Sequence, residues 1–143
     1  MINTPNLEEA KRLINKVESP VVVLAQNDDF NRKLLENAKF DILLSVEEGD
    51  RKNKVRQTDS GLNHVLAKIA AKNNVAIGLD LISIKSLGQK QKAERLSKIM
   101  QNIKVCRKAK TKLAVKAQSL EEARSFLLGL GASTNQVSQT IVF

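Results

Sequence analysis

Four short apolar segments, separated by stretches with helical periodicity, constrain the fold of this chain more than any other feature of its sequence. They are residues 21–25, 40–46, 75–84 and 113–117. A helix-length stretch lies between successive segments, which is the crossover connection that parallel strands need. Strands of a parallel sheet are covered on both faces, so their sequences are apolar throughout. We therefore expect a single α/β domain over residues 1–143, with a mostly parallel sheet and alternating helices.

Two architectures fit this alternation of strands and helices. Four strand–helix units are half of a closed eight-fold barrel. The sheet is therefore either open and doubly wound or a reduced, incomplete TIM-barrel-like fold. The tail, residues 133–143, forms either a short helix or a strand, and its pattern favours a helix.

Apolar residues at helical spacing predict where the helices lie and which sides they bury. The clearest helix begins at Asp59 or Ser60, and a helix from about Gln89 to Ala109 follows the third strand. The first has an apolar stripe that consists of Leu62, Val65, Leu66, Ile69 and Ala70. The second has an inward face that consists of Ala93, Leu96, Ile99, Met100 and Ile103. A further helix, capped by Asp28, extends to about Lys39.

The net charge of +9 is concentrated in one part of the chain. The segment from Lys85 to Lys112 holds ten basic residues and one acid, Glu94, and therefore accounts for the whole excess. A localised basic surface is typical of proteins that bind a polyanion such as RNA, DNA or an anionic membrane. A helix face that only increases solubility is the alternative.

Two groups of basic residues are candidates for RNA contact. The first group is expected to share a solvent-facing surface of the basic helix and consists of Lys92, Arg95, Lys98 and Lys108. The chain has no Tyr or Trp, and this group contains no aromatic residue, which favours contact with phosphates of folded RNA over stacking on single-stranded bases. The second group lies in a polar segment before a helix and consists of Arg51, Lys52, Lys54 and Arg56. An ordinary polar loop explains this second group equally well.

The sequence contains no complete set of catalytic or metal-binding residues. His64 is the only histidine, so a metal site built from several histidines is excluded. Cys106 is the only cysteine, and no second histidine is available to activate it. The single cysteine, the lack of a long apolar run and the polar start of the chain predict a cytoplasmic protein without a membrane partner.

Three stretches resemble one known family. They are Phe40-Asp-Ile-Leu, Glu47-Glu-Gly and the long run Asp59-Ser-Gly-Leu-Asn-His-Val-Leu-Ala-Lys-Ile-Ala-Ala-Lys-Asn-Asn-Val-Ala-Ile. Together with Asn31-Arg32 they closely resemble ribonuclease P protein component 3, the archaeal counterpart of the thirty-kilodalton subunit of the eukaryotic enzyme. The specific match spans about Val21 to Leu81, under half of the chain. The sequence departs from the family at Val46-Glu47, where the family tends to have His-Pro, and in residues 50–58, a loop longer than the family's.

The resemblance implies a fold and a function. The fold is a barrel related to metal-dependent phosphoesterases that lacks their metal-binding histidines, and it is incomplete here because the chain is short. The function is that of a subunit of an endonuclease, a ribonucleoprotein hydrolase that removes the 5′ leader of precursor tRNA. Catalysis lies with the RNA subunit and its associated Mg²⁺, so the protein needs no cofactor of its own.

The resemblance also implies partners and motif residues. The partners are ribonuclease P RNA, ribonuclease P protein component 2 and, indirectly, precursor tRNA. The motif residues, with a structural or RNA-contacting role, are Asp59, Ser60, Gly61, Asn63 and His64. Two other functions stay open: a free-standing metal-dependent phosphoesterase and a protein–protein adaptor that does not contact RNA.

Overall fold

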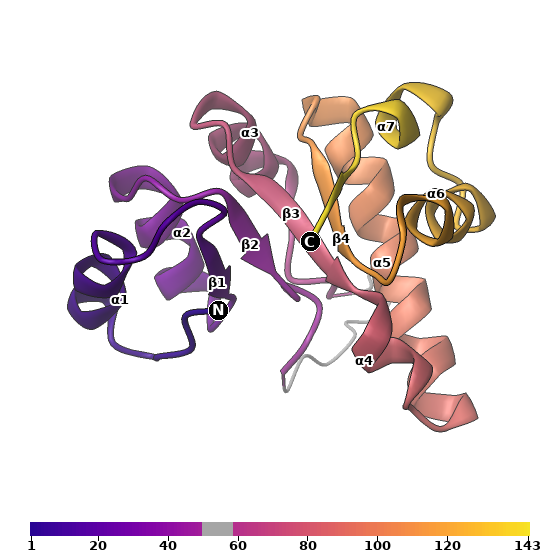
Figure 1. Cartoon of the computed structure of the whole chain (residues 1–143), viewed down its shortest axis with the longest axis horizontal. Helices are drawn as coiled ribbons and strands as arrows, with labels where there is room; N and C mark the ends of the chain where they lie inside the picture. Colours follow the sequence, from indigo (N-terminus) through magenta and orange to yellow (C-terminus); the bar gives the residue numbers. More distant parts are fainter. Residues whose placement is uncertain (50–58) are drawn as a thin grey trace.

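The computed structural model describes residues 1–49 and 59–143, and a five-stranded sheet forms its centre (Figure 1). The strands are β1 (Val22–Leu24), β2 (Ile42–Leu44), β3 (Ala76–Asp80), β4 (Leu113–Lys116) and β5 (Ile141–Val142). Every neighbouring pair is parallel, and Ile2 adds a parallel bridge to Val23 at the outer edge. The predicted α/β fold with a parallel sheet is confirmed.

The order of the strands decides between the two architectures. It follows the chain, β1-β2-β3-β4-β5, and never reverses as it does in a doubly wound sheet. Crossovers between parallel strands have one hand, so an order without reversal returns the helices over the same face of the sheet. The incomplete barrel is therefore the observed architecture. The helices are α1 (Leu7–Ile14), α2 (Asp28–Asn37), α3 (His64–Lys72), α4 (Leu81–Lys85), α5 (Gln89–Ala109), α6 (Leu120–Gly129) and α7 (Thr134–Ser138).

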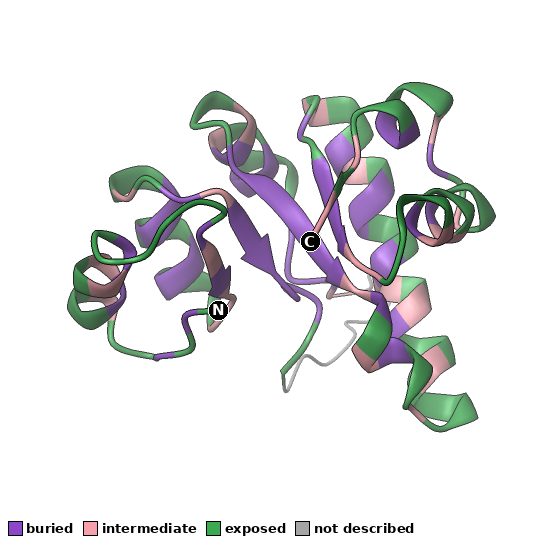
Figure 2. Ribbon diagram, in the orientation of Figure 1, coloured by how far each residue is buried: buried purple, intermediate pink, exposed green. Residues whose placement is uncertain are grey.

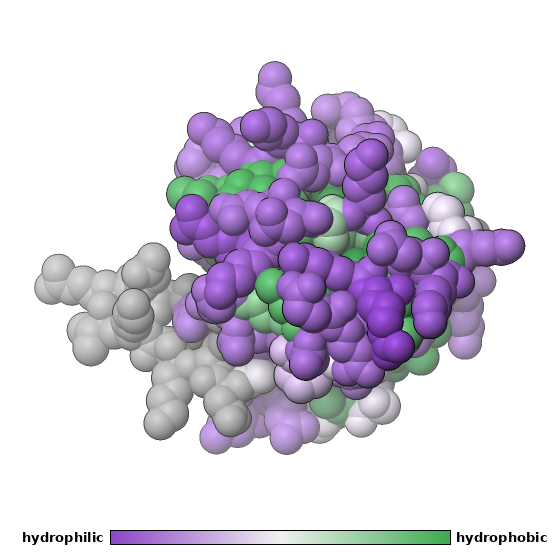
Figure 3. All heavy atoms as spheres, turned by 90° about the vertical axis from the view of Figure 1, so that its left-hand side faces the viewer, coloured by the Kyte–Doolittle hydropathy of each residue, from purple (hydrophilic) through white to green (hydrophobic). Residues whose placement is uncertain are grey.

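The main core lies between the sheet and these helices. Alternate strand residues point to this face, among them Val23, Leu43, Ile77 and Val115. They meet buried helix residues such as Leu34, and the strands and inward helix faces are correspondingly buried in Figure 2. Seen from the side on which α1 and α2 lie, the surface is mostly hydrophilic, with apolar groups in small separate patches (Figure 3). The helices thus present polar faces to solvent and apolar faces to the sheet.

The opposite, concave face of the sheet has a small core of its own. Ile42, Ala76 and Ala114 are buried there, and the partly buried Val22 and Phe143 pack against them. Phe143 follows β5, and the carboxyl terminus lies in front of β3 and β4 in Figure 1. On the central strands β3 and β4 the residues of this core are small, Ala76 and Ala114, because a curled sheet brings the side chains of neighbouring strands together. The end of the chain therefore covers part of the concave face.

Two helices, α2 and α3, are capped by a different residue from the predicted one. α2 is capped by Asn27, whose side chain accepts a hydrogen bond from Phe30 N, and not by Asp28. α3 begins at His64, because Asn63 caps it and Gly61 has a positive φ of 79° that is incompatible with a helix. The predicted start at Asp59 or Ser60 was therefore wrong.

Some residues predicted to be buried are exposed. Val65 in α3 is 53% exposed and Met100 in α5 is 42% exposed, and Ala93 is also exposed. In α5 the buried side is rotated relative to the prediction and consists of Arg95, Ile99, Asn102, Ile103 and Cys106. Polar residues occupy two of these positions, so a pattern of apolar residues alone placed the stripe wrongly.

The third apolar segment and the tail each contain two elements. The segment 75–84 holds β3 and the first four residues of α4, which Asp80 caps through Ser83 N. The tail holds α7 and then β5, so the preferred helix is confirmed but a fifth strand was missed.

Cys106 is fully buried in α5, and this burial raises the pKa of its thiol to about 12.

We predict that Gly78→Ala destabilises the protein, because the concave face has no room for a side chain there. A Cβ at Gly78 would lie 2.6 Å from Ile42 Cγ2 and 3.3 Å from the Cα of Leu44. Overpacking of this kind costs about 1–3 kcal/mol, which urea denaturation would measure. Gly129→Ala is the control, since nothing lies within 4 Å of a Cβ at that position in α6. Equal stability of the two variants would contradict the tight curl of the sheet.

Candidate nucleic-acid interface

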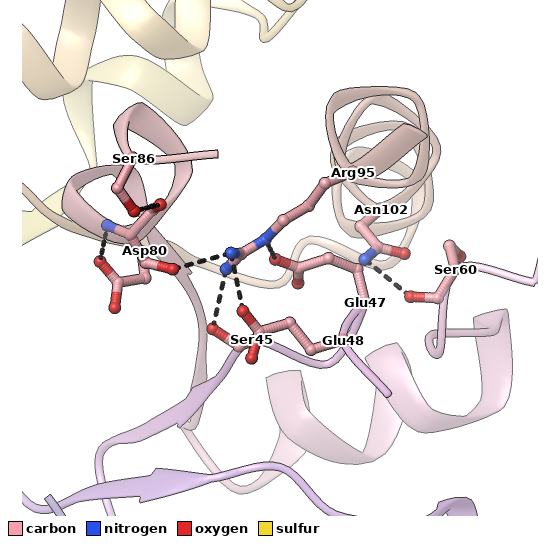
Figure 4. A network of polar contacts seen from close by, with 9 residues as sticks. Ser45, Glu47, Glu48, Ser60, Asp80, Ser86, Arg95 and Asn102 are labelled. Carbon is pink, nitrogen blue, oxygen red and sulfur yellow. Dashed lines mark hydrogen bonds and ion pairs between the residues drawn. The ribbon is translucent and has the colours of Figure 1, made fainter. Parts of the chain in front are cut away.

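A buried arginine, Arg95 of α5, organises the carboxyl edge of the sheet (Figure 4). Its Nε donates to Glu47 Oε1 at 3.0 Å, and its Nη1 lies 2.7 Å from Glu48 Oε1. The same guanidinium donates to Ser83 Oγ at 2.9 Å and to Ser45 Oγ at 3.3 Å. These partners follow β2 or lie in α4, so one side chain ties three elements together.

Two carboxylates share this one guanidinium, but their surroundings differ. The Glu47 side chain is fully buried, whereas that of Glu48 is 43% exposed. Burial raises the pKa of Glu47 above its ordinary value, and the charge of Arg95 only partly offsets this effect. Oε2 of Glu47 and Oδ1 of Asn102 are buried acceptors without a hydrogen-bond donor in the described part of the chain.

The expectation that Arg95 faces solvent was wrong, because only 7% of the residue is exposed. Burial of a charged side chain is costly unless it is paired and hydrogen-bonded, and this network provides the pairing. The sequence carried a signal for it. Arg95 lies four and eight residues before Ile99 and Ile103, so it shares their side of the helix. Glu47 directly follows an apolar strand segment, and a carboxylate buried at such a position needs a positively charged or hydrogen-bonding partner.

The other predicted RNA-contacting residues fall into two sets. Arg51, Lys52, Lys54 and Arg56 lie outside the described residues. Lys108 is exposed, whereas Lys92 and Lys98 are half-buried. At 100° per residue, Lys92 and Lys108 lie about 160° apart around the axis of α5. The expected common surface of the basic helix therefore does not form from these four residues.

The motif from Asp59 to His64 forms the entry to α3. The Asp59 carboxylate accepts from Gly61 N at 3.2 Å, and the Asn63 side chain accepts from Leu66 N at 2.9 Å. Ser60 is buried, and its carbonyl accepts from Asn102 Nδ2 at 3.0 Å, which ties this entry to α5. His64 is exposed at the first position of α3. The contacts of these residues support a structural part for all of them except His64.

A hollow at the carboxyl edge of the sheet is acidic. Its lining residues are Ala25, Gln26, Asn27, Asp28, Glu48, Gly49 and Asp59. Three of these are carboxylates and none is basic. Over residues 1–49 and 59–143, no three His, Cys, Asp or Glu side chains are grouped so that they could hold a metal ion. In the same two ranges, no helix has both the length and the apolar character needed to cross a bilayer.

Comparison with known proteins finds similar sequences in methanogenic archaea. Ribonuclease P protein component 3 of Methanothermobacter thermautotrophicus is 32% identical over 111 residues, 76% of this chain and 42% of that protein. The protein of the same name from Methanococcus maripaludis is 28% identical over 117 residues, 80% of this chain and 47% of that protein. The chain thus spans about half the length of the curated relatives it matches. No model of a protein family matches it.

The fold also has a counterpart among solved structures. A chain in a cryo-EM structure of archaeal ribonuclease P with mature tRNA superposes with a TM-score of 0.77 and 22% identity. The match covers 96% of this chain and 61% of that chain. The resemblance to ribonuclease P protein component 3 is confirmed by the sequences, and this likeness confirms the fold.

We predict that Arg95→Leu lowers the free energy of unfolding by about 3–5 kcal/mol, because it leaves the buried Glu47 carboxylate without its partner. Urea denaturation at neutral pH would measure the loss. Lys104→Leu, at an exposed position of the same helix, should change stability by less than about 0.5 kcal/mol. The double variant Arg95→Leu/Glu47→Leu should recover much of the loss, and strictly additive losses would contradict a direct coupling.

We also predict how pH affects Glu47. A carboxyl whose pKa is raised by folding binds its proton more tightly in the folded chain. Its ionisation therefore costs stability above the raised pKa, and this cost disappears as the pH falls towards the ordinary value of 4.5. Relative to Glu47→Gln, which cannot ionise, the wild type should gain stability as the pH falls from about 8 to about 5. An unchanged difference in melting temperature over this range would contradict the raised pKa.

Proposed function

We propose that this chain, a relative of ribonuclease P protein component 3, acts as a protein subunit of an archaeal ribonuclease P. In this role it assists the removal of the 5′ leader from precursor tRNA, while the RNA subunit performs the chemistry. The observation that carries the proposal is the sequence similarity to the component 3 proteins of several methanogens, which extends over three quarters of the chain. The likeness of fold to a chain from an archaeal ribonuclease P structure agrees with it.

Two observations favour a part in RNA binding over a part in catalysis. The residues with the most unusual surroundings, Arg95 and Glu47, are buried against each other and are not open to a substrate. The net charge of +9 favours a polyanionic partner. Lysine residues bind phosphates as point charges, without reading bases, which suits a folded RNA. We further propose ribonuclease P protein component 2 as the protein partner and precursor tRNA as an indirect one.

Reconstitution would test this function. We predict that the chain, added to ribonuclease P RNA and component 2 of Methanothermobacter thermautotrophicus in place of its component 3, raises the rate of precursor tRNA cleavage. It should do so because it helps the RNA to fold and neutralises its phosphates. Cleavage at the 5′ leader, followed on a gel over time, is the measurement. RNA with component 2 alone is the reference.

Binding and hydrolysis assays on the same chain separate the alternatives. An adaptor that does not touch RNA would bind component 2 but would show no salt-dependent binding to the RNA. A phosphoesterase would hydrolyse a model phosphodiester with a divalent metal and without the RNA subunit. Either result, or a cleavage rate equal to the reference, would count against the proposed function.

A further inference from the structure

Lysines without an ion pair gather at the amino edge of the sheet. At this edge α3 and α5 end and β3 and β4 begin, in the upper part of Figure 1. We call these residues the lysine edge, which consists of Lys72, Lys104, Lys108, Lys110 and Lys112. All five are exposed, and in the described part of the chain none of them forms an ion pair. Among the other described lysines, Lys11, Lys33, Lys85 and Lys116 have an acidic partner, whereas Lys16, Lys39, Lys68, Lys90 and Lys92 form no ion pair. What distinguishes the lysine edge is therefore that five such lysines lie at one edge of the sheet.

A hollow of about 140 Å³ lies within the lysine edge. It is lined by Asp41, Ala71, Asn74, Val75, Ala76, Lys110, Lys112 and Ile141. It is several times larger than the roughly 30 Å³ that one water molecule occupies in the liquid. The lining contains a single carboxylate, that of Asp41, whose Oδ2 accepts from Ser19 Oγ at 2.8 Å and from Val21 N at 2.6 Å. These neutral donors leave the charge of Asp41 in place, so the two lysines give the lining an excess of one positive charge.

Helix stability alone does not explain the lysine edge. Cations near the carboxyl ends of α3 and α5 complement the helix dipoles, which accounts for Lys72 and Lys108. It does not account for Lys112, which lies beyond the end of α5 and next to β4.

The backbone of Lys110 is a second observation. This residue ends α5 in the left-handed conformation, with φ 60° and ψ 34°, where glycine or asparagine is usual. The end of α3 shows the usual choice, since Asn74 occupies this region there with a φ of 56°. A lysine kept in a sparsely populated conformation points to a use for its side chain.

We propose that the lysine edge is a phosphate-binding site for RNA, in which Lys110 and Lys112 hold one backbone phosphate over the hollow. Lys72, Lys104 and Lys108 contact neighbouring phosphates. Lys104 and Lys108 are one helical turn apart and lie on the exposed side of α5. None of the residues that line the hollow is aromatic, so they offer no side chain for base stacking and the site binds the RNA backbone. This inference rests on the proposed function and assigns the RNA contact to the edge opposite the acidic hollow.

The test is a salt titration of RNA binding, with ribonuclease P RNA of Methanothermobacter thermautotrophicus as the probe. In Lys110→Gly/Lys112→Gln the slope of log K against log salt should fall by about 0.7–0.9, since the two lysines hold one phosphate and each phosphate contact contributes about that much. The melting temperature should be equal to or higher than that of the wild type, because glycine relieves the backbone at position 110. A purely structural part for Lys110 predicts the opposite change in melting temperature.

Two further variants make the test specific. Lys11→Gln/Lys33→Gln removes the same charge from ion-paired lysines of α1 and α2, and it should leave the slope nearly unchanged. Lys104→Gln/Lys108→Gln should also lower the slope, by about 0.7–0.9 for each phosphate contact that is lost, and it decides the question if the first variant fails to fold.

The other possible outcomes contradict the lysine edge, the proposed function or the assignment to RNA. If the wild type binds the RNA but all variants keep its slope, or if the control loses as much, the lysine edge is not the site and the proposed function stands. If the wild type binds the RNA without salt dependence or not at all, the proposed function fails first. Equal loss of binding to phosphatidylglycerol vesicles would indicate a general polyanion surface and overturn the assignment to RNA.

Discussion

A parallel pair of strands cannot be joined by a tight turn, so each connection in this chain has to return along the sheet. The strand order never reverses, and the helices therefore return over the same face, each running from the carboxyl edge of the sheet to its amino edge. The curl of the sheet, the small residues of its concave face and the close approach at Gly78 follow from this arrangement. So does the grouping of side chains, because the loops that follow the strands lie at one edge, and the helices that lead into the next strand end at the other.

The acidic hollow and the lysine edge lie at different edges of the sheet. At the carboxyl edge, Glu47 and Glu48 take up the charge of Arg95, and Asp28 and Asp59 line the hollow next to them. At the amino edge, the lysines after α5 have no acidic partner among the described residues. A net charge counted along the sequence does not show this separation. Arg95 belongs to the basic segment by sequence, yet it stabilises the interior and adds nothing to the basic surface.

The sequence predicted the class of fold because apolar segments and helical periodicity are local properties. The helix from Gln89 to Ala109 was predicted with its observed bounds. What the sequence did not show depends on pairs of distant residues. Arg95 is buried because Glu47, forty-eight positions earlier, lies beside it. The start of α3 moved to His64 because a cap at Asn63 competed with Asp59 and Ser60, which are also good capping residues. The lysine edge was missed because it combines the ends of two helices that only the fold brings together.

The burial of Cys106 has a practical consequence. Its thiol lies in the core between α5 and the sheet, and with a pKa of about 12 almost none of it is thiolate near neutral pH. A thiol reagent can therefore reach this side chain only while α5 is detached from the sheet. Because the chain has one cysteine, labelling involves a single site, and its rate under native conditions reports how often the helix opens. The labelling rate of Cys106 therefore measures the transient separation of α5 from the sheet without any added probe.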